Sequence, residues 1–416
     1  MIEALDTVSH PVPPALLRTP RLSRAARGMG GSFLREVMEL AARPGVLSFA
    51  VGHPAADLFP REALAEATAR VLSAGAAALQ YCLPLQELKE QIVGIMALRG
   101  VRCRPDQVFL TGGAQQAMDL LTHLLLDPGG QVLLEETIYD GIRIAVRRFE
   151  PRIITVPTDA TAGIDVDAVE AVLDGSKGGA ARPAFLYLIP ESHNPLGVSL
   201  PLASRRRLVE LARRYRLPLI EDDTYGLLGG GEPLPALRSL DEEWVYHVGS
   251  FSKLLAPALR VGWAVVPEPL IPRLSMLKQA ADIDTASLSH RAVAAFLASG
   301  ALPGHLLRLR REYGSRRSAM LASLAAHMPP GARWNHPPGG LYIWVELPRS
   351  IDATALLRIA VETEEVAFTP GEAFASCDAA GIRHCLRLSY GSSTPEQIDE
   401  GIRRLGRAAS RFILAA

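Results

Sequence analysis

Lysine is rare in this chain, so each lysine is a candidate for chemistry that arginine cannot perform. The sequence has 44 lysines and arginines together, and the only lysines among them are Lys89, Lys177, Lys253 and Lys278. A lysine amine can form an imine with a carbonyl compound, whereas an arginine guanidinium stays protonated and cannot. Only Lys253 directly follows an apolar run, in the sequence Ser250-Phe-Ser-Lys253. It is therefore the candidate for covalent chemistry.

Polar residues follow two further apolar runs at the point where each run ends. Asn194 follows the run 184–189, and Asp222 and Tyr225 follow the run 218–221. In open sheets of parallel strands, ligands bind at the carboxyl ends of the strands. Each residue taken alone could be an ordinary loop or turn residue. Together with Lys253 at a third strand end, they indicate one shared site.

A glycine-rich turn joins another predicted strand to a helix. The run 108–110 continues into Thr111-Gly-Gly-Ala-Gln-Gln, and apolar spacing predicts a helix over Ala114–Leu126. Small residues let the backbone approach a ligand, and the free N–H groups at a helix start suit a phosphate. Turns of this kind are common in proteins without such a ligand. The turn therefore indicates a phosphate site only in combination with the other candidate residues.

Strands and helices alternate along most of the sequence after residue 100. This alternation predicts an α/β fold with a largely parallel sheet covered by helices on both faces. Helices are also expected at 32–42, at Leu202–Tyr215 and across much of 270–328. The predicted strands are 108–110, 131–135, 152–156, 184–189, 218–221, 244–249 and 261–266.

The pattern changes towards both ends of the chain, which predicts three regions. Residues 1–50 are expected to form an N-terminal arm and a helix that packs with a small domain. Residues 51–310 are expected to form the large ligand-binding domain. After the sequence His336-Pro-Pro-Gly-Gly the pattern is typical of a smaller α+β unit, and the predicted small domain is 311–416.

Composition excludes several classes of function. The 44 basic residues equal the 44 acidic residues, so neither a basic nucleic-acid surface nor an acidic tail is expected. No apolar run approaches the ~18 residues of a membrane span, and the first residues do not read as a signal peptide. Four cysteines without CxxC spacing predict neither disulfides nor a metal site. We therefore expect a cytoplasmic protein of enzyme size.

The motifs resemble those of the pyridoxal-phosphate-dependent aminotransferases of class I and II, which have fold type I. The most specific part is Ser250-Phe-Ser-Lys253 followed by Ala256-Pro-Ala-Leu-Arg260-Val-Gly. The resemblance runs from about Ser32 to the C-terminus and is strongest to the α-aminoadipate/kynurenine branch. That branch also has segments similar to Ser32-Phe-Leu-Arg35, Leu47-Ser-Phe-Ala, Leu186-Tyr-Leu-Ile-Pro and Leu386-Arg-Leu-Ser-Tyr. The family fold has a mostly parallel seven-stranded sheet in a large domain and a smaller α+β domain.

The resemblance assigns a role to each candidate around the cofactor ring. Lys253 would hold pyridoxal 5′-phosphate as a Schiff base and later move protons. Asp222 would keep the pyridine nitrogen protonated, so that the ring withdraws electrons. Asn194 and Tyr225 would bond the phenolate oxygen, and Tyr139 would stack on the ring.

The resemblance also assigns the phosphate and substrate contacts. Arg387 would bind the substrate α-carboxylate bidentately, with Gly52 and Asn194 also at the substrate. Arg35 matches a residue that some relatives use for a side-chain carboxylate. Tyr81 would reach the phosphate of a neighbouring subunit, which implies a homodimer. The residues expected at the chain's own phosphate are Gly113, Ala114, Gln115, Ser250, Ser252 and Arg260.

Three departures from the family pattern lie on the substrate side. Val51-Gly52-His53 replaces a segment that usually begins with a glycine pair. The stretch after Tyr81 is about two residues short and lacks glycine. His193 precedes Asn194 where glutamine or a small polar residue is usual. A histidine could transfer protons near neutral pH or simply be a buried structural residue.

Three functions follow from these observations. The first is an aminotransferase that moves an amino group between an α-amino acid and a 2-oxo acid through the Lys253 Schiff base and a quinonoid intermediate. The second keeps the cofactor but carries out β- or γ-elimination, replacement, cyclisation or oxidation on an amino acid, as family members in specialised metabolism do. The third is the effector domain of a transcription regulator, which would need a DNA-binding domain that residues 1–31 are expected to be too short to form.

Overall fold

The computed structural model describes residues 22–23, 26–27, 33–176, 182–230, 234–377 and 380–415. Lys177, Ser32 and most of the predicted N-terminal arm lie outside these ranges. The helix predicted at 32–42 is present as α2, Phe33–Ala41.

The main sheet has seven strands in the order β2-β10-β9-β8-β7-β3-β4. Each predicted strand is in it, with boundaries within one residue of those expected. Strand β10 is antiparallel to both of its neighbours, and the other pairs are parallel. The predicted mostly parallel sheet is thus confirmed. The strands are β2 (Val108–Thr111), β3 (Gln131–Glu135), β4 (Arg152–Val156), β7 (Pro183–Leu188), β8 (Leu219–Asp222), β9 (Val245–Ser250) and β10 (Gly262–Val265).

Helices cover both faces of this sheet. Side chains alternate between the two faces along each strand, and apolar side chains point to both. In β3, Val132 and Leu134 belong to a buried cluster with α5 and α6, whereas Leu133 belongs to one with α7 and α8. Helix α8 has its predicted bounds. These four helices are α5 (Ala114–Leu125), α6 (Asp140–Arg147), α7 (Val166–Gly175) and α8 (Leu202–Tyr215).

A second, smaller sheet has the strand order β11-β12-β15-β14. Strand β1 pairs in parallel with β13, so residues Leu47 and Ser48 join this smaller unit. The elements are β1 (Leu47–Ser48), β11 (Arg333–Trp334), β12 (Tyr342–Glu346), β13 (Val366–Ala367), β14 (Thr369–Pro370), β15 (Cys385–Ser389), α12 (Ala353–Glu364) and α13 (Pro395–Ala415).

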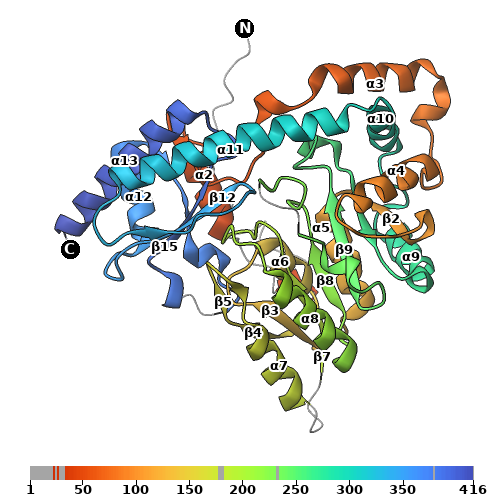
Figure 1. The fold of residues 1–416 in the computed structure, drawn as a ribbon, viewed down its shortest axis with the longest axis horizontal. Helices are drawn as coiled ribbons and strands as arrows, with labels where there is room; N and C mark the ends of the chain where they lie inside the picture. The colour runs from red at the N-terminus through yellow and green to blue at the C-terminus, as the bar shows by residue number, and fades with distance from the viewer. Residues whose placement is uncertain are drawn as a thin grey trace, which may run out of the picture.

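One long helix, α11 (Leu302–His327), connects the two units. Figure 1 shows it extending from α13 beside the small sheet to α10 beside the large one. It passes the predicted domain boundary at 310–311 without a break, so the domain limits themselves remain a prediction. The helical stretch expected at 270–328 is divided into α9 (Ile271–Asp282), α10 (Ser287–Ala298) and α11.

Two further helices and a short hairpin complete the regular elements named here. They are α3 (Arg61–Ser73), α4 (Gln86–Ala97) and the hairpin of β5 (Thr158–Asp159) and β6 (Gly163–Ile164). In the described part of the chain, no single helix has the length and apolar character to cross a membrane; α10 and α11 reach them only as a pair bent by 92°.

Candidate active site

A cavity of about 290 Å³ opens at the carboxyl ends of the main-sheet strands. It collects residues from the large sheet, from the small sheet and from the segment after β1. The predicted site residues that line it are Gly52, Ala114, Gln115, Tyr139, Asn194, Asp222, Tyr225, Ser250, Ser252, Lys253, Arg260 and Arg387. Sequence reasoning therefore placed most of its candidates on one wall or another of a single cavity.

Lys253 lies three residues beyond the end of β9, where the strand delivers it to the cavity. Its Nζ donates a hydrogen bond to the carbonyl oxygen of Gly52 at 2.7 Å. The amine is thus held at the cavity wall by a single neutral acceptor among its recorded hydrogen bonds, which leaves it available to react with a bound carbonyl group.

Asp222 is the last residue of β8 and is buried. The Tyr187 hydroxyl donates to its Oδ2 at 2.8 Å, and the Thr224 N–H donates to Oδ1 at 3.3 Å. Burial raises the pKa of Asp222 above its ordinary value, although these two hydrogen bonds oppose that shift. A buried carboxylate with few donors favours a cationic partner.

A chain of polar contacts connects the two sheets across the cavity. The hydroxyls of Tyr225 and Tyr342 are 2.8 Å apart, and the guanidinium carbon of Arg387 lies 4.5 Å from the centre of the Tyr342 ring. Arg387 NH1 donates to Asn194 Oδ1 at 2.8 Å. Asn194 comes from the large sheet and Arg387 from β15 of the small one.

Arg387 is buried and lacks a negatively charged partner within the part of the chain that the structure describes. Besides Asn194, its recorded acceptors are the Ala50 carbonyl and the Thr369 hydroxyl, and its Nε has no partner. Burial lowers the pKa of Arg387 because it disfavours the charged form. A carboxylate bound here would compensate this charge, as a bidentate arginine contact does.

The part of the cavity around Arg260 and the start of α5 is suited to bind an anion. Gly113 precedes α5 with φ of +101°, and a Cβ at this position would lie 2.6 Å from Arg260 NH2. Arg260 NH2 donates to the Gly112 carbonyl at 2.7 Å. The Ser250 hydroxyl donates to Ser252 Oγ at 3.0 Å. The glycine thus lets the arginine lie against the helix start, where free N–H groups attract phosphate.

Tyr139 contributes an aromatic ring to the same cavity. A Cβ on Gly141 would come within 2.2 Å of the Tyr139 ring and 2.4 Å of Gln115 Oε1. Gln115 Nε2 donates to the Gly141 carbonyl at 2.8 Å. Burial and the charge of Asp222 raise the pKa of Tyr139 to about 12, so its ring stays neutral. The absence of a side chain at Gly141 therefore leaves the space that this aromatic ring and Gln115 occupy.

The segment after β1 forms the outer wall. A Cβ at Gly52 would be 2.1 Å from the Tyr342 hydroxyl, so only glycine fits there. Val51, His53 and Met38 of α2 line the same wall. Burial and the nearby charge of Lys253 lower the pKa of His53, so this imidazole is mainly neutral at pH 7.

Three predicted residues do not line the cavity. Gly113 is not among the lining residues, although Ala114 and Gln115 directly after it are. Arg35 has a side chain that is 81% exposed and donates to Glu39 Oε1 at 3.1 Å. Tyr81 is 77% exposed. The roles proposed for Arg35 and Tyr81 remain predictions, because neither residue meets the other site residues within one chain.

Both ring nitrogens of His193 have hydrogen-bond partners, as in a buried structural histidine. Its Nδ1 accepts from the Leu196 N–H at 3.3 Å, which leaves Nε2 to donate to Glu135 Oε2 at 3.0 Å. It is buried and does not line the cavity.

Sequence reasoning missed Tyr187 and Tyr342, which bond Asp222 and Tyr225. A tyrosine within an apolar strand needs a hydrogen-bond partner for its hydroxyl, and this is the signal that could have identified them.

The donor set fits pyridoxal phosphate. It offers an amine, a buried carboxylate, a neutral aromatic face, an arginine beside a helix start and a second arginine without a counter-ion. These are the groups that an aldehyde, a ring nitrogen, a ring face, a phosphate and an amino-acid carboxylate require.

Known proteins resemble this chain along most of its length. The 2-aminoadipate transaminase of Thermus thermophilus is 41% identical over 396 residues, which cover 92% of this chain and 95% of that protein. An aromatic-amino-acid aminotransferase of Thermococcus litoralis is 35% identical over 389 residues, covering 92% of each. The crystal structure of an α-aminoadipate aminotransferase from Thermus thermophilus, complexed with N-(5′-phosphopyridoxyl)-L-leucine, superposes with a TM-score of 0.87 at 39% identity, covering 95% of this chain and 98% of that one.

A family model for aminotransferase class I and II matches residues 44–405. The match contains every residue that lines the cavity except Met38. This match and the relatives that align along most of the chain confirm the fold that the motifs predicted. The chain is a member of the class I and II aminotransferase family, whose cofactor is pyridoxal 5′-phosphate.

Proposed function

We propose that this aminotransferase exchanges the amino group of an α-amino acid with a 2-oxo acid through Lys253, Asp222 and Arg387. The observation that carries the proposal is the position of these three groups on the walls of one cavity. The amine, the carboxylate and the guanidinium would engage the cofactor aldehyde, the cofactor ring nitrogen and the substrate carboxylate.

Pyridoxal phosphate, when bound, supplies an aldehyde for the amino group and a ring that withdraws electrons from the substrate α-carbon. Lys253 would hold the cofactor and, once released, move a proton at the α-carbon. Asp222 would hold the proton on the ring nitrogen. Arg260, Ser250 and Ser252, with the N–H groups of Ala114 and Gln115, would bind the phosphate.

The substrate side chain would face Met38, Val51 and His53. This wall is apolar apart from one imidazole, whose lowered pKa leaves it mainly neutral. Arg35 lies one turn before Met38 on α2 and would meet a side-chain carboxylate only if its bond to Glu39 were exchanged. The wall therefore favours an uncharged side chain over the carboxylate-bearing side chain of 2-aminoadipate.

A homodimer in the cytoplasm is part of the proposal. Leu79, Tyr81, Leu83, Met276 and Ile283 are large apolar side chains that are at least 67% exposed. The backbone N–H of Cys82 bonds Asp284 Oδ2 at 3.3 Å, which holds the two segments together. An apolar surface of this kind is typical of a protein interface. A second copy would cover it and bring Tyr81 to the neighbouring phosphate site.

A single turnover with a panel of amino acids tests the function. Aminotransfer yields pyridoxamine phosphate in amounts equal to the enzyme, with the 2-oxo acid. Release of ammonia while the cofactor stays in its aldehyde form would instead establish elimination. Inclusion of leucine, phenylalanine and 2-aminoadipate tests the expected preference for an uncharged side chain.

A further inference from the structure

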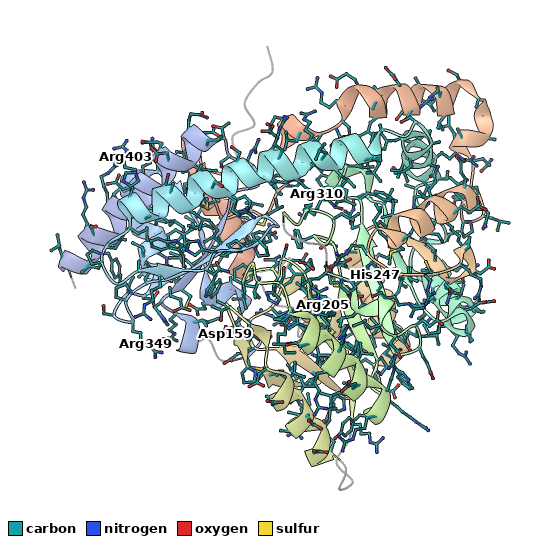
Figure 2. All side chains as sticks on the ribbon, viewed as in Figure 1. Asp159, Arg205, His247, Arg310, Arg349 and Arg403 are labelled. Atoms are coloured by element: carbon teal, nitrogen blue, oxygen red, sulfur yellow. The ribbon has the colours of Figure 1, made fainter. Side chains whose placement is uncertain are left out.

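A cluster of buried charged residues lies beside the cavity and outside the contacts assigned so far. It contains Arg99, Glu191, Arg205, Asp223 and His247, each with a side chain at most 9% exposed. A small void lined by Arg99, Asp223 and His247 shares Thr224 and Ser250 with the cavity itself. Figure 2 shows Arg205 and His247 within the body of the molecule, in contrast to Arg349 and Arg403 at its edge.

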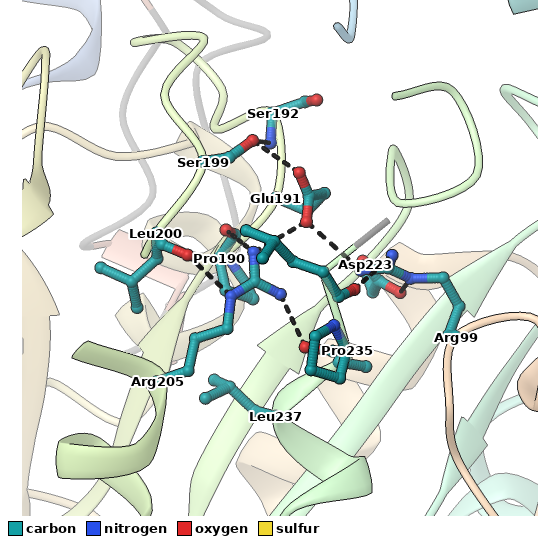
Figure 3. Close-up of polar contacts among 12 residues, drawn as sticks. Arg99, Pro190, Glu191, Ser192, Ser199, Leu200, Arg205, Asp223, Pro235 and Leu237 are labelled. Carbon is teal, nitrogen blue, oxygen red and sulfur yellow. Dashed lines mark hydrogen bonds and ion pairs between the residues drawn. The ribbon is translucent and has the colours of Figure 1, made fainter. Parts of the chain in front are cut away.

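The contact at the centre of the cluster is a bidentate ion pair. Arg99 Nε lies 2.7 Å from Asp223 Oδ2, and NH2 lies 3.1 Å from Oδ1. His247 Nε2 is 3.2 Å from the same Oδ2. Arg99 also approaches Glu191 at 3.5 Å, and Arg205 binds Glu191 at 2.7 Å (Figure 3). The two guanidinium groups and the two carboxylates thus neutralise one another in a buried environment.

The cluster connects the three segments that carry the central site residues. Glu191 lies three residues before Asn194. Asp223 directly follows Asp222 and lies two residues before Tyr225. His247 is on β9, which leads to Lys253. Arg99 lies two residues after α4. It contacts the segments of Glu191 and Asp223 directly, and it reaches His247 through Asp223.

The turn after β8 closes tightly over the ion pair. A Cβ at Gly226 would lie 2.2 Å from Asp223 Oδ1 and 2.5 Å from Arg99 Nε. The Gly226 N–H bonds the Asp223 carbonyl at 3.3 Å. The turn that carries Tyr225 therefore packs directly against the guanidinium–carboxylate contact.

The pair also controls charge next to Asp222. Burial opposes ionisation of Asp223, but Arg99 and His247 outweigh it and hold its pKa well below the usual range. The negative charge of Asp223 in turn contributes to the raised pKa of Asp222. Without the guanidinium, the His247 imidazole would remain beside the Asp223 carboxylate, but the negative charge would act more strongly on Asp222.

We propose that Arg99 is a positioning residue for the reaction: its ion pair with Asp223 fixes the turn from Asp222 to Tyr225 and compensates the charge that would otherwise favour protonation of Asp222. This inference rests on the proposed role of Asp222 at the ring nitrogen. Arg99 touches neither the cavity nor the reacting atoms, so its effect passes through Asp223.

The test compares Arg99→Gln with Arg205→Gln in the reconstituted enzyme. Arg205 is equally buried and belongs to the same cluster, but it does not contact Asp223. The readout is the pH midpoint at which the visible absorbance of the bound cofactor changes. A proton on the ring nitrogen disfavours protonation elsewhere on the cofactor, so a less anionic Asp222 moves this midpoint to higher pH.

Arg99→Gln should raise the midpoint by about 0.5 units or more and lower kcat about tenfold, with KM changed less than about threefold. Arg205→Gln should lower the melting temperature without moving the midpoint. The double variant Arg99→Gln/Asp223→Asn, which removes both charges, should restore the midpoint. Arg99→Lys keeps the charge and loses the bidentate geometry, so its midpoint should match the wild type even if Arg99→Gln does not fold.

Two results overturn the inference. One is an unchanged midpoint in Arg99→Gln, and the other is an equal shift in Arg205→Gln. Asp222→Asn separates this failure from that of the proposed function. If Asp222→Asn moves the midpoint and Arg99→Gln does not, only the role of Arg99 is wrong; if neither moves it, the assignment of Asp222 fails as well.

Discussion

Asp222 and Asp223 are adjacent carboxylates in opposite electrostatic surroundings. Asp222 receives two hydrogen bonds from neutral donors, whereas Asp223 lies against a guanidinium and an imidazole. Burial raises the pKa of the first, and Arg99 together with His247 lowers that of the second despite burial. Such separation of neighbouring carboxyl groups is typical of functional sites.

The opposite shifts predict opposite effects of removing each charge from the apoenzyme. The pKa of Asp222 is higher in the folded state, so its ionised form costs stability above the ordinary value of about 3.9. Asp222→Asn should therefore leave the melting temperature at pH 7 unchanged or raised. The pKa of Asp223 is lower in the folded state, so its charge contributes stability above that value. Asp223→Asn breaks a buried ion pair, so it should lower the free energy of unfolding by about 3–5 kcal/mol.

Melting curves of both variants from about pH 2.5 to about pH 7 check these two predictions, because the ordinary pKa of aspartate lies inside that range. The deficit of Asp223→Asn should shrink as the pH falls through the ordinary range of aspartate. A large destabilisation by Asp222→Asn, equal to that of Asp223→Asn, would contradict the assigned surroundings.

Lys253 should carry the cofactor covalently. Reduction of the holoenzyme with borohydride, followed by peptide mapping, should label Lys253. Lys253→Ala should retain the fold and lose the label, because the amine contributes one recorded hydrogen bond, to the Gly52 carbonyl. Lys278→Ala is the control, since that lysine pairs with Asp282 at 2.7 Å outside the cavity. Labelling of Lys89 or Lys278 would refute the assignment.

At the scale of elements, the start of α6 illustrates how a missing side chain positions a functional one. Gly141→Ala would place a methyl group against the Tyr139 ring and Gln115. We expect the ring to be displaced and cofactor affinity to fall about tenfold, as measured by fluorescence titration of the apoenzyme.

Gly314→Ala is the matched control for this prediction. Gly314 lies within α11 with nothing within 4 Å of its Cβ position. The same substitution there should leave cofactor affinity unchanged and increase stability by about 0.5–1 kcal/mol. If Gly141→Ala bound the cofactor as the control does, the ring would not depend on that contact.

The elements themselves were largely predictable from sequence. Apolar runs bounded by polar residues located all seven strands of the main sheet, because buried strands need such runs. The place of β10 between β2 and β9 was not predictable, since chain order carries no information on that pairing. The same limit applies to Tyr187 and Tyr342, whose bonds to Asp222 and Tyr225 join residues that are 35 and 117 positions apart.

At the scale of the whole molecule, Tyr81 is exposed in one chain and predicted to complete the site of another. Tyr81 does not line the cavity of its own chain. Large exposed apolar side chains lie near it in sequence and on the segment that the Cys82–Asp284 hydrogen bond holds beside it. Tyr81→Phe should then weaken cofactor retention by one hydrogen bond to a charged group, ~1.5–3 kcal/mol.

Mixing variants tests this geometry. A heterodimer of a Tyr81→Phe chain and a Lys253→Ala chain would contain one site with both residues intact, so cofactor retention should recover. A Tyr81→Phe chain mixed with a Tyr81→Phe/Lys253→Ala chain restores no complete site and is the control. Heterodimers without recovery would mean that Tyr81 acts within its own subunit or has no role.

The bond from Arg387 to Asn194 has a thermodynamic consequence for the molecule as a whole. Arg387 stands on the small sheet, and Asn194 and Lys253 follow strands of the large one. In the proposed function, an amino acid would be held at its carboxylate by Arg387 and at its amino group near Lys253, and it would therefore link two separately packed layers. The free energy of substrate binding would then add to the free energy needed to separate those layers. Tight-binding substrates would thus slow amide exchange in β15, and the same tightness would slow the departure of the product.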